Sequence, residues 1–198
     1  MAVIAFANLK GGVGKSTLAV SVAGQFASGG KAVALVDADP QGTVAAWAEA
    51  GNLPFEVLPL PLAAGNVQRW IERVLALTAD LVVIDLPPML GDATAAALAV
   101  ADVAAVPVSP SGADLTATGK ALDLIGRARA ERAGEKPRAL LIPSRVDRRT
   151  AAGAEIEAVL HDFGEPVGPV VSQRIAHVDA FSAGQWVGDY APGSAAHA

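Results

Sequence analysis

Two lysines stand five residues apart in a glycine-rich stretch near the N-terminus, "KGGVGKST" from Lys10 to Thr17. Glycines allow backbone N–H groups to curl around phosphate oxygens, and a helix that begins directly afterwards adds a partial positive charge. Lys15 can reach the β and γ phosphates of a nucleotide, and the Ser16 hydroxyl can bind Mg²⁺. The nucleotide-binding residues that this stretch predicts are Gly11, Gly12, Val13, Gly14, Lys15, Ser16 and Thr17.

The leading lysine makes this loop unusual. The common G-x-x-x-x-G-K-[ST] pattern would place its first glycine at Leu9, whereas this run has Lys10 in front of its glycines. A lysine at the junction of strand and loop projects away from the phosphates that its own loop holds. A second nucleotide site facing this one would be a natural target for Lys10, and a solvated turn residue is the alternative.

Acidic residues end two apolar runs further along the chain. The run "VALVDAD" presents Asp37 and Asp39 two residues apart, so that both side chains point to the same side of a strand. The run "LVVID" delivers Asp85, as in the arrangement that holds Mg²⁺ in phosphate-loop NTPases, although a helix cap or turn former is the alternative. Beside a phosphate site, one carboxylate can hold Mg²⁺ or its waters while another positions the attacking water.

The elements that must position these residues alternate between short apolar runs and helix-length segments, which is typical of repeated βα units. We therefore expect a single-domain P-loop NTPase of the α/β class, with a mostly parallel central sheet flanked by helices on both faces. The expected strands cover 3–8, 32–37, 55–58, 81–85, 103–108, 138–143 and 167–171. The expected helices cover 15–28, 41–50, 66–77, 94–101, 115–132 and 151–162.

The composition limits the possible function classes. Because the chain has no cysteine, disulfides, thiolate metal sites and cysteine-ligated iron–sulfur clusters are excluded. No charged leader and no apolar segment long enough to span a bilayer is found, which predicts a cytoplasmic protein that does not use a membrane. The predicted ATPase domain covers residues 1–190, and residues 191–198 are expected to form a flexible tail.

The charge is unevenly spread along the chain. The net charge is −5, yet residues 127–149 hold eight basic residues against three acidic ones, so this segment is +5 and the remainder −10. Such a segment indicates a polyanion-binding face, and a solvated helix end and loop is the alternative. The candidate DNA contacts are Arg127, Arg129, Arg132, Lys136, Arg145, Arg148 and Arg149.

The runs "KGGVGKS", "DADPQG" and "LVVIDLPP" resemble the motifs of the deviant Walker A ATPases of the ParA/MinD family. The resemblance is closest to short ParA-type partition proteins. It implies ATP and Mg²⁺ as cofactors, and it implies that Lys10 enters the partner's site in a nucleotide-sandwich dimer. By the same resemblance Asp39 orients the attacking water. The implied catalytic residues are Lys10, Lys15 and Asp39. The implied metal-binding residues are Ser16, Asp37 and Asp85.

A later run, "LLIPSRVD", resembles the place where the family recognises the nucleotide base. Many members carry asparagine there, whereas this chain has Ser144 followed by Arg145. Arg145 could stack on or bond to the base, or it could belong to the basic segment.

The resemblance implies an ATP-dependent homodimer that binds nonspecific DNA and is nucleoid-associated when ATP-bound. A ParB-like or other cargo-bound protein would stimulate hydrolysis to ADP and phosphate, so that a plasmid, chromosome or protein cargo is partitioned or positioned. One alternative is a MinD-like membrane ATPase, which needs a terminal amphipathic helix that "WVGDYAPGSAAHA" does not provide. Another is a small-molecule ligase of the same P-loop class, although such ligases lack the leading lysine. An electron-transfer ATPase is excluded because it requires cysteine ligands.

Overall fold

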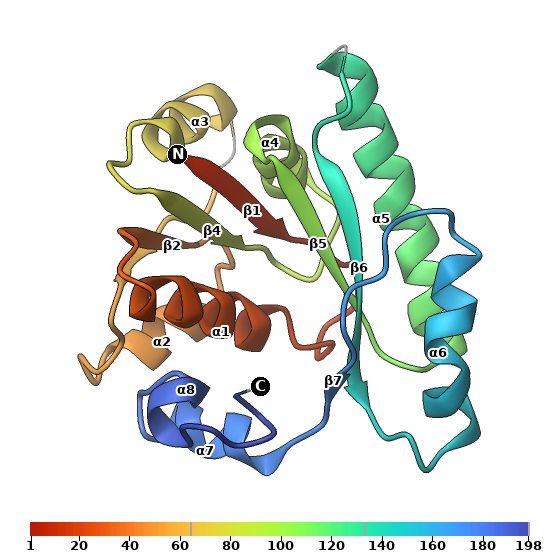
Figure 1. Cartoon of the computed structure of the whole chain (residues 1–198). Helices are drawn as coiled ribbons and strands as arrows, with labels where there is room; N and C mark the ends of the chain where they lie inside the picture. The colour runs from red at the N-terminus through yellow and green to blue at the C-terminus, as the bar shows by residue number, and fades with distance from the viewer. Residues whose placement is uncertain (64, 133, 198) are drawn as a thin grey trace.

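The fold is built on one parallel β-sheet, seen in a computed structural model that describes residues 1–63, 65–132 and 134–197 (Figure 1). In this part of the chain seven strands pair in the order β3-β2-β4-β1-β5-β6-β7, and every pair is parallel. Their carboxyl ends therefore meet at one edge of the sheet. The strands are β1 Ala2–Phe6, β2 Val33–Asp37, β3 Glu56–Pro59, β4 Leu81–Asp85, β5 Val103–Val108, β6 Arg138–Val146 and β7 Val171–Ser172.

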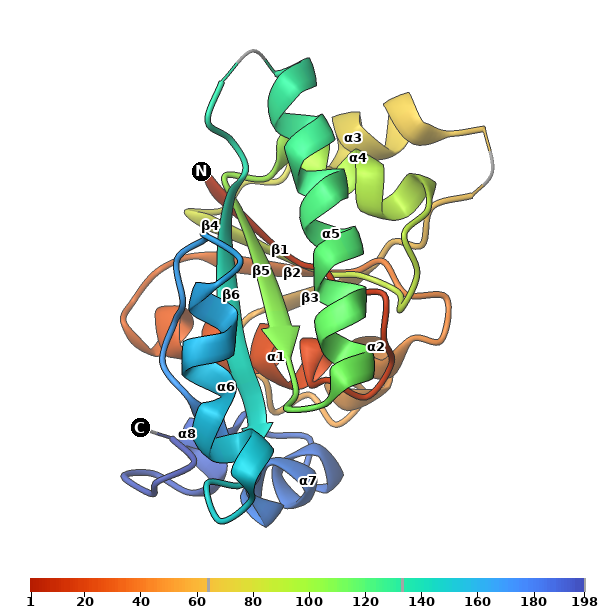
Figure 2. The same cartoon turned by 90° about the vertical axis from the view of Figure 1, so that its right-hand side faces the viewer.

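Helices cover both faces of the sheet, as Figures 1 and 2 show from two sides. One face packs against α1, α2, α7 and α8, and the other packs against α3 to α6. The helices are α1 Lys15–Ser28, α2 Thr43–Ala48, α3 Val67–Leu75, α4 Asp92–Val100, α5 Gly112–Glu131, α6 Ala151–His161, α7 Ile175–Ser182 and α8 Val187–Tyr190. The expected fold class is confirmed.

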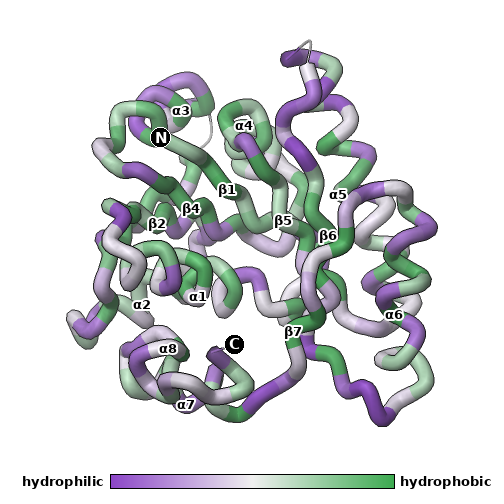
Figure 3. The backbone as a smooth tube through the Cα atoms, in the orientation of Figure 1, coloured by the Kyte–Doolittle hydropathy of each residue, from purple (hydrophilic) through white to green (hydrophobic). Residues whose placement is uncertain are grey.

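The central strands are apolar because both of their faces are covered. Every residue of β2 and β4 is buried, including the aspartates that end them, Asp37 and Asp85. The hydropathy colouring in Figure 3 shows the same strands as a hydrophobic centre. Two acidic side chains are thus carried into the interior by strands whose other residues favour burial there.

The structure differs from the expected elements mainly in the last third of the chain. Strand β6 continues three residues past Pro143, and β7 is only two residues long. Helices α7 and α8 were not among the expected helices. In residues 191–197, for which a flexible tail stays a prediction, the His197 ring lies edge-on to the Trp186 indole, with 5.3 Å between the ring centroids; residue 198 lies outside the described residues.

Trp186 joins this last third to the first helix. Its side chain is 3% exposed and lies in the cluster formed by α1, β1 and β2. Gly24 in α1 and Gly188 in α8 both lie directly against the indole, and a Cβ atom at either position would overlap it. The tryptophan therefore requires glycine at both places.

We expect Gly24→Ala to destabilise the protein by roughly 1–3 kcal/mol, because the added methyl group must displace the indole. Gly119→Ala is the matched control, since Gly119 also lies inside a helix but has no neighbour within 4 Å of its Cβ position. The control should gain about 0.5–1 kcal/mol from helix propensity. Urea unfolding measures both changes, and equal effects at the two glycines would contradict the packing argument.

Candidate nucleotide site

The glycine-rich loop joins β1 to α1 at the carboxyl edge of the sheet. Gly12 and Gly14 adopt left-handed backbone angles, with φ of 77° and 93°, which favour glycine over any residue with a side chain. The loop ends at the first turn of α1, where free N–H groups can receive an anion. Lys15 is only 7% exposed, and its Nζ donates a hydrogen bond to the Lys10 carbonyl oxygen at 3.2 Å.

Burial lowers the pKa of Lys15, and the charges of Asp85 and Asp39 oppose that shift. No carboxylate in the described part of the chain forms an ion pair with this ammonium group. A buried cation without an anionic partner is a strong attraction for the phosphates of a ligand.

A groove of about 1120 Å³ opens beside the loop. It brings together most of the nucleotide-binding residues that the sequence predicts, together with the carboxylate of Asp39 and the end of β6. The predicted residues that line it are Gly11, Gly12, Gly14, Lys15, Ser16, Thr17, Asp39, Ser144 and Arg145. The Val13 side chain is buried in the core instead, so only its backbone is left to contact a ligand.

Asp85 does not line this groove and is fully buried. Neither carboxylate oxygen has a hydrogen-bond partner, and burial raises the pKa to about 7 although the nearby Ser16 hydroxyl and Lys15 favour the charged form. An orphaned carboxylate next to a hydroxyl, at the phosphate loop, fits a Mg²⁺ site because hard cations prefer oxygen ligands. The residues that could hold the ion here are Asp85 and Ser16.

Asp37 has a different role in the fold. It pairs in register with Asp85 on the neighbouring strand, but its carboxylate accepts hydrogen bonds from the backbone N–H groups of Asp39 at 3.1 Å and Ala45 at 2.8 Å. Burial raises the pKa of Asp37, against the effect of these bonds. Asp37 therefore holds the loop that presents Asp39 to the groove, and its place in the Mg²⁺ shell stays a prediction.

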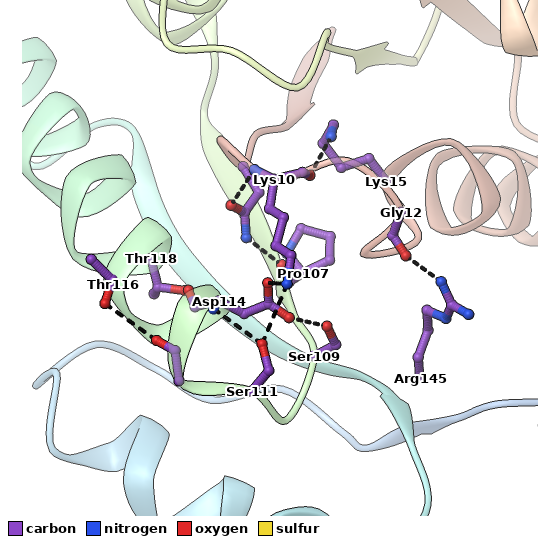
Figure 4. A network of polar contacts seen from close by, with 12 residues as sticks. Lys10, Gly12, Lys15, Pro107, Ser109, Ser111, Asp114, Thr116, Thr118 and Arg145 are labelled. Atoms are coloured by element: carbon purple, nitrogen blue, oxygen red, sulfur yellow. Dashed lines mark hydrogen bonds and ion pairs between the residues drawn. The ribbon is translucent and has the colours of Figure 1, made fainter.

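Lys10 does not line the groove, and Figure 4 shows its side chain reaching toward Asp114, away from Arg145. Its Nζ forms an ion pair with Asp114 at 2.6 Å and lies 3.4 Å from the Ser111 hydroxyl. The Asp114 side chain is fully buried, whereas that of Lys10 is 42% exposed. Burial alone would raise the pKa of Asp114, but bonds from Lys10, Ser109 and Ser111 hold it below the usual value.

Asp114, which the sequence prediction did not include, is the partner of the predicted site residue Lys10. The signal was present, because Ser111 and Asp114 stand three residues apart as in a capping box, and the Ser111 hydroxyl accepts a hydrogen bond from the Asp114 N–H at the start of α5. Arg174 and His177 were missed too. They line the groove from the turn into α7, and burial lowers the pKa of His177.

The predicted basic segment does not form one patch. Strand β6 separates its two ends by about 26 Å, at 3.3 Å per residue. At the amino end, Arg129 pairs with Glu165, Lys136 pairs with Asp102, and Arg132 donates to carbonyl oxygens at the end of α4. At the carboxyl end, Arg148 and Arg149 line the groove beside Arg145.

This sheet, with a phosphate loop and acidic strand ends at one edge, defines a P-loop nucleotide-binding domain. The family model CbiA, described as the CobQ/CobB/MinD/ParA nucleotide binding domain, matches residues 4–187. The chain belongs to that family.

Relatives in the family include partition and positioning proteins. The chromosome-partitioning ATPase Soj of Thermus thermophilus is 36% identical, and the alignment covers 98% of this chain and 91% of Soj. Maintenance of carboxysome distribution protein A of Halothiobacillus neapolitanus is 32% identical. The alignment covers 83% of this chain and 76% of that protein.

Solved structures share the fold at lower identity. The septum site-determining protein MinD of Pyrococcus horikoshii, complexed with Mg-ADP, has a TM-score of 0.74 at 19% identity, with 99% of this chain and 91% of MinD covered. Cobyrinic acid a,c-diamide synthase of Mycobacterium smegmatis, with bound ATP analog and magnesium, has a TM-score of 0.69 at 23% identity. The match covers 92% of this chain and 93% of the synthase.

We expect Asp85→Asn to stabilise the ligand-free protein while removing its response to Mg²⁺. At pH 8, above the raised pKa, the wild-type carboxylate is charged, buried and without a hydrogen-bond partner. Neutralising it should therefore raise the free energy of unfolding by on the order of 2 kcal/mol. The same variant should lose the Mg²⁺-dependent part of the thermal stabilisation by ATP.

The matched control is Asp39→Asn, since Asp39 is partly exposed and its neutralisation should leave the free energy of unfolding within about 0.5 kcal/mol of wild type. Thermal unfolding in metal-free buffer, then with ATP and with Mg-ATP, separates the two effects. Loss of stability in metal-free Asp85→Asn would contradict the assignment.

Proposed function

We propose that this protein is a ParA-like partition or positioning ATPase. ATP closes two copies face to face, the dimer binds DNA without sequence preference, and a cargo-bound partner protein stimulates hydrolysis to ADP and phosphate. The names of the relatives, a chromosome-partitioning ATPase and a carboxysome distribution protein, support this class of function. No described helix is long and apolar enough to cross a bilayer.

The observation that carries the proposal is the position of Lys10. Lys10 does not line the groove of its own chain, whereas Lys15 does. The Lys10 side chain is partly exposed, and its partner Asp114 sits on the first turn of α5 at the same edge of the sheet. A cation held at this edge, beside but not in the site, is placed to enter the site of a second copy.

Each residue then has a part in the reaction. Lys15 binds the β and γ phosphates, and Asp39 orients the attacking water from the loop that Asp37 holds. Bound Mg²⁺ would supply charge neutralisation at the phosphates from Ser16 and Asp85. Lys10 of the opposite copy stabilises the charge that develops as the γ-phosphate leaves, in the manner of an arginine finger.

We propose the rim of the groove as the DNA face. Arg148 and Arg149 lie there with Arg174, which is 25 residues away in the sequence from Arg149. Arg148 and Arg149 pair with Glu157 and Asp147, but those carboxylates are themselves exposed. Closure of a dimer would gather two copies of this rim, which would make DNA binding depend on ATP because released counterions favour a dense group of cations.

Binding to nonspecific duplex DNA tests the proposed function. We expect binding with ATP, little or none with ADP or without nucleotide, and a loss of affinity when salt is raised from 50 to 200 mM, as for any contact made through phosphates. Lys10→Ala should still bind ATP but fail to dimerise and fail to bind DNA. Fluorescence anisotropy reports DNA binding, and light scattering reports the dimer.

Two outcomes would contradict the proposal. Dimerisation of Lys10→Ala equal to that of wild type would remove Lys10 from the opposite site. Absence of DNA binding under every nucleotide would favour a protein or membrane surface, or ligase chemistry, over a DNA-bound switch.

Charge reversal distinguishes the two ends of the basic segment. Arg149→Glu with Arg174→Glu at the groove rim should weaken ATP-dependent DNA binding at least tenfold and reduce the salt slope by about 4, because the dimer carries two copies of each arginine. Arg127→Glu with Arg138→Glu, near the amino edge of the sheet, makes the same change of charge and should alter the affinity less than threefold. The reverse ranking of the two double variants would place DNA at the amino edge.

A further inference from the structure

Arg145 has an unusual backbone conformation at the end of β6. Its φ is 56°, and it is the only residue other than glycine with a positive φ in the part of the chain that the structure describes. Left-handed backbone is unfavourable for a residue with a side chain. The same place holds a register shift, because Ser144 and Val146 pair with the successive residues Val171 and Ser172.

This bulge turns two successive side chains toward the phosphate loop. In a regular strand Ser144 and Arg145 would point to opposite faces of the sheet. Here the Ser144 hydroxyl lies 3.1 Å from the Cβ position of Gly14, and Arg145 Nη1 lies 3.7 Å from that of Gly12. The irregular backbone thus adds an arginine to the contact between β6 and the loop.

The guanidinium is tied to the loop. Nη1 of Arg145 donates a hydrogen bond to the Gly12 carbonyl oxygen at 2.5 Å, which Figure 4 shows on the side of the loop away from Lys10. No carboxylate pairs with this guanidinium in the described residues, and the side chain lines the groove. An arginine that uses one donor keeps four others, and their planar fork matches phosphate oxygens.

We propose that Arg145 is a phosphate ligand of its own chain, which holds the Gly12 carbonyl with one N–H group and the nucleotide's phosphate chain with the others. This replaces the base contact and the basic-patch role that the sequence left open, since a guanidinium bonded to Gly12 stays at the middle of the phosphate loop. The inference rests on the proposed nucleotide site but does not depend on DNA binding or dimerisation. It gives the site a third cation beside Lys15 and the partner's lysine.

Two ligands distinguish a contact of Arg145 with the phosphates from a contact with the base. Titration calorimetry measures the affinity of the full chain for Mg-ADP and for tripolyphosphate, which has no base or ribose. Arg145→Gln should weaken both ligands by about tenfold, the size of one charge-assisted hydrogen bond to phosphate. Arg145→Lys should recover part of the loss, because it restores the charge without the fork.

Arg138→Gln is the matched control, since it removes the same charge from the other end of β6, where Arg138 is exposed and does not line the groove. It should change neither affinity by more than twofold, and the melting temperatures of all variants show whether each is folded. Loss of ADP affinity with unchanged tripolyphosphate affinity would overturn the proposal in favour of a base contact. Unchanged affinity of Arg145→Gln for both ligands would also overturn the proposal. Failure of the wild-type protein to bind either ligand would instead refute the nucleotide site itself.

Discussion

Two buried charges that do not pair with each other determine the rest of the site. Lys15 and Asp85 both lie at the carboxyl edge of the sheet, nearly or fully inaccessible to water, yet no ion pair joins them. Burial lowers the pKa of the lysine and raises that of the aspartate to about 7, which are the shifts expected when charge is desolvated. A cation and an anion that lie at one edge of the sheet without an ion pair between them fit a ligand that carries phosphate and a divalent metal.

The surrounding fold keeps these charges in place. Parallel strands covered on both faces deliver Asp37 and Asp85 side by side, and the glycine loop closes over Lys15. Asp37 gives its oxygens to backbone N–H groups and so fixes the loop that carries Asp39. Asp37 thus has partners in the backbone, whereas the carboxylate of Asp85 on the neighbouring strand has none.

Two basic residues extend from this centre in opposite directions. Lys10 is held by buried Asp114 on the first turn of α5, while Arg145 is held by the Gly12 carbonyl on the groove side. In the proposed cycle the first cation serves the opposite copy and the second serves its own chain. Because Asp114 is buried and bonded to two serines as well, the position of Lys10 is tied to the start of α5.

The sequence alone determined the sheet class, the phosphate loop and the acidic strand ends, because these depend on local spacing and on apolar runs that must be buried. It could not decide which charges meet. Asp114 and Lys10 are 104 residues apart, the basic segment is divided by the length of β6, and Arg174 joins Arg148 and Arg149 only through the chain's return along β7. Only tertiary packing brings such side chains together, since a contact across the sheet edge leaves no periodicity in the chain.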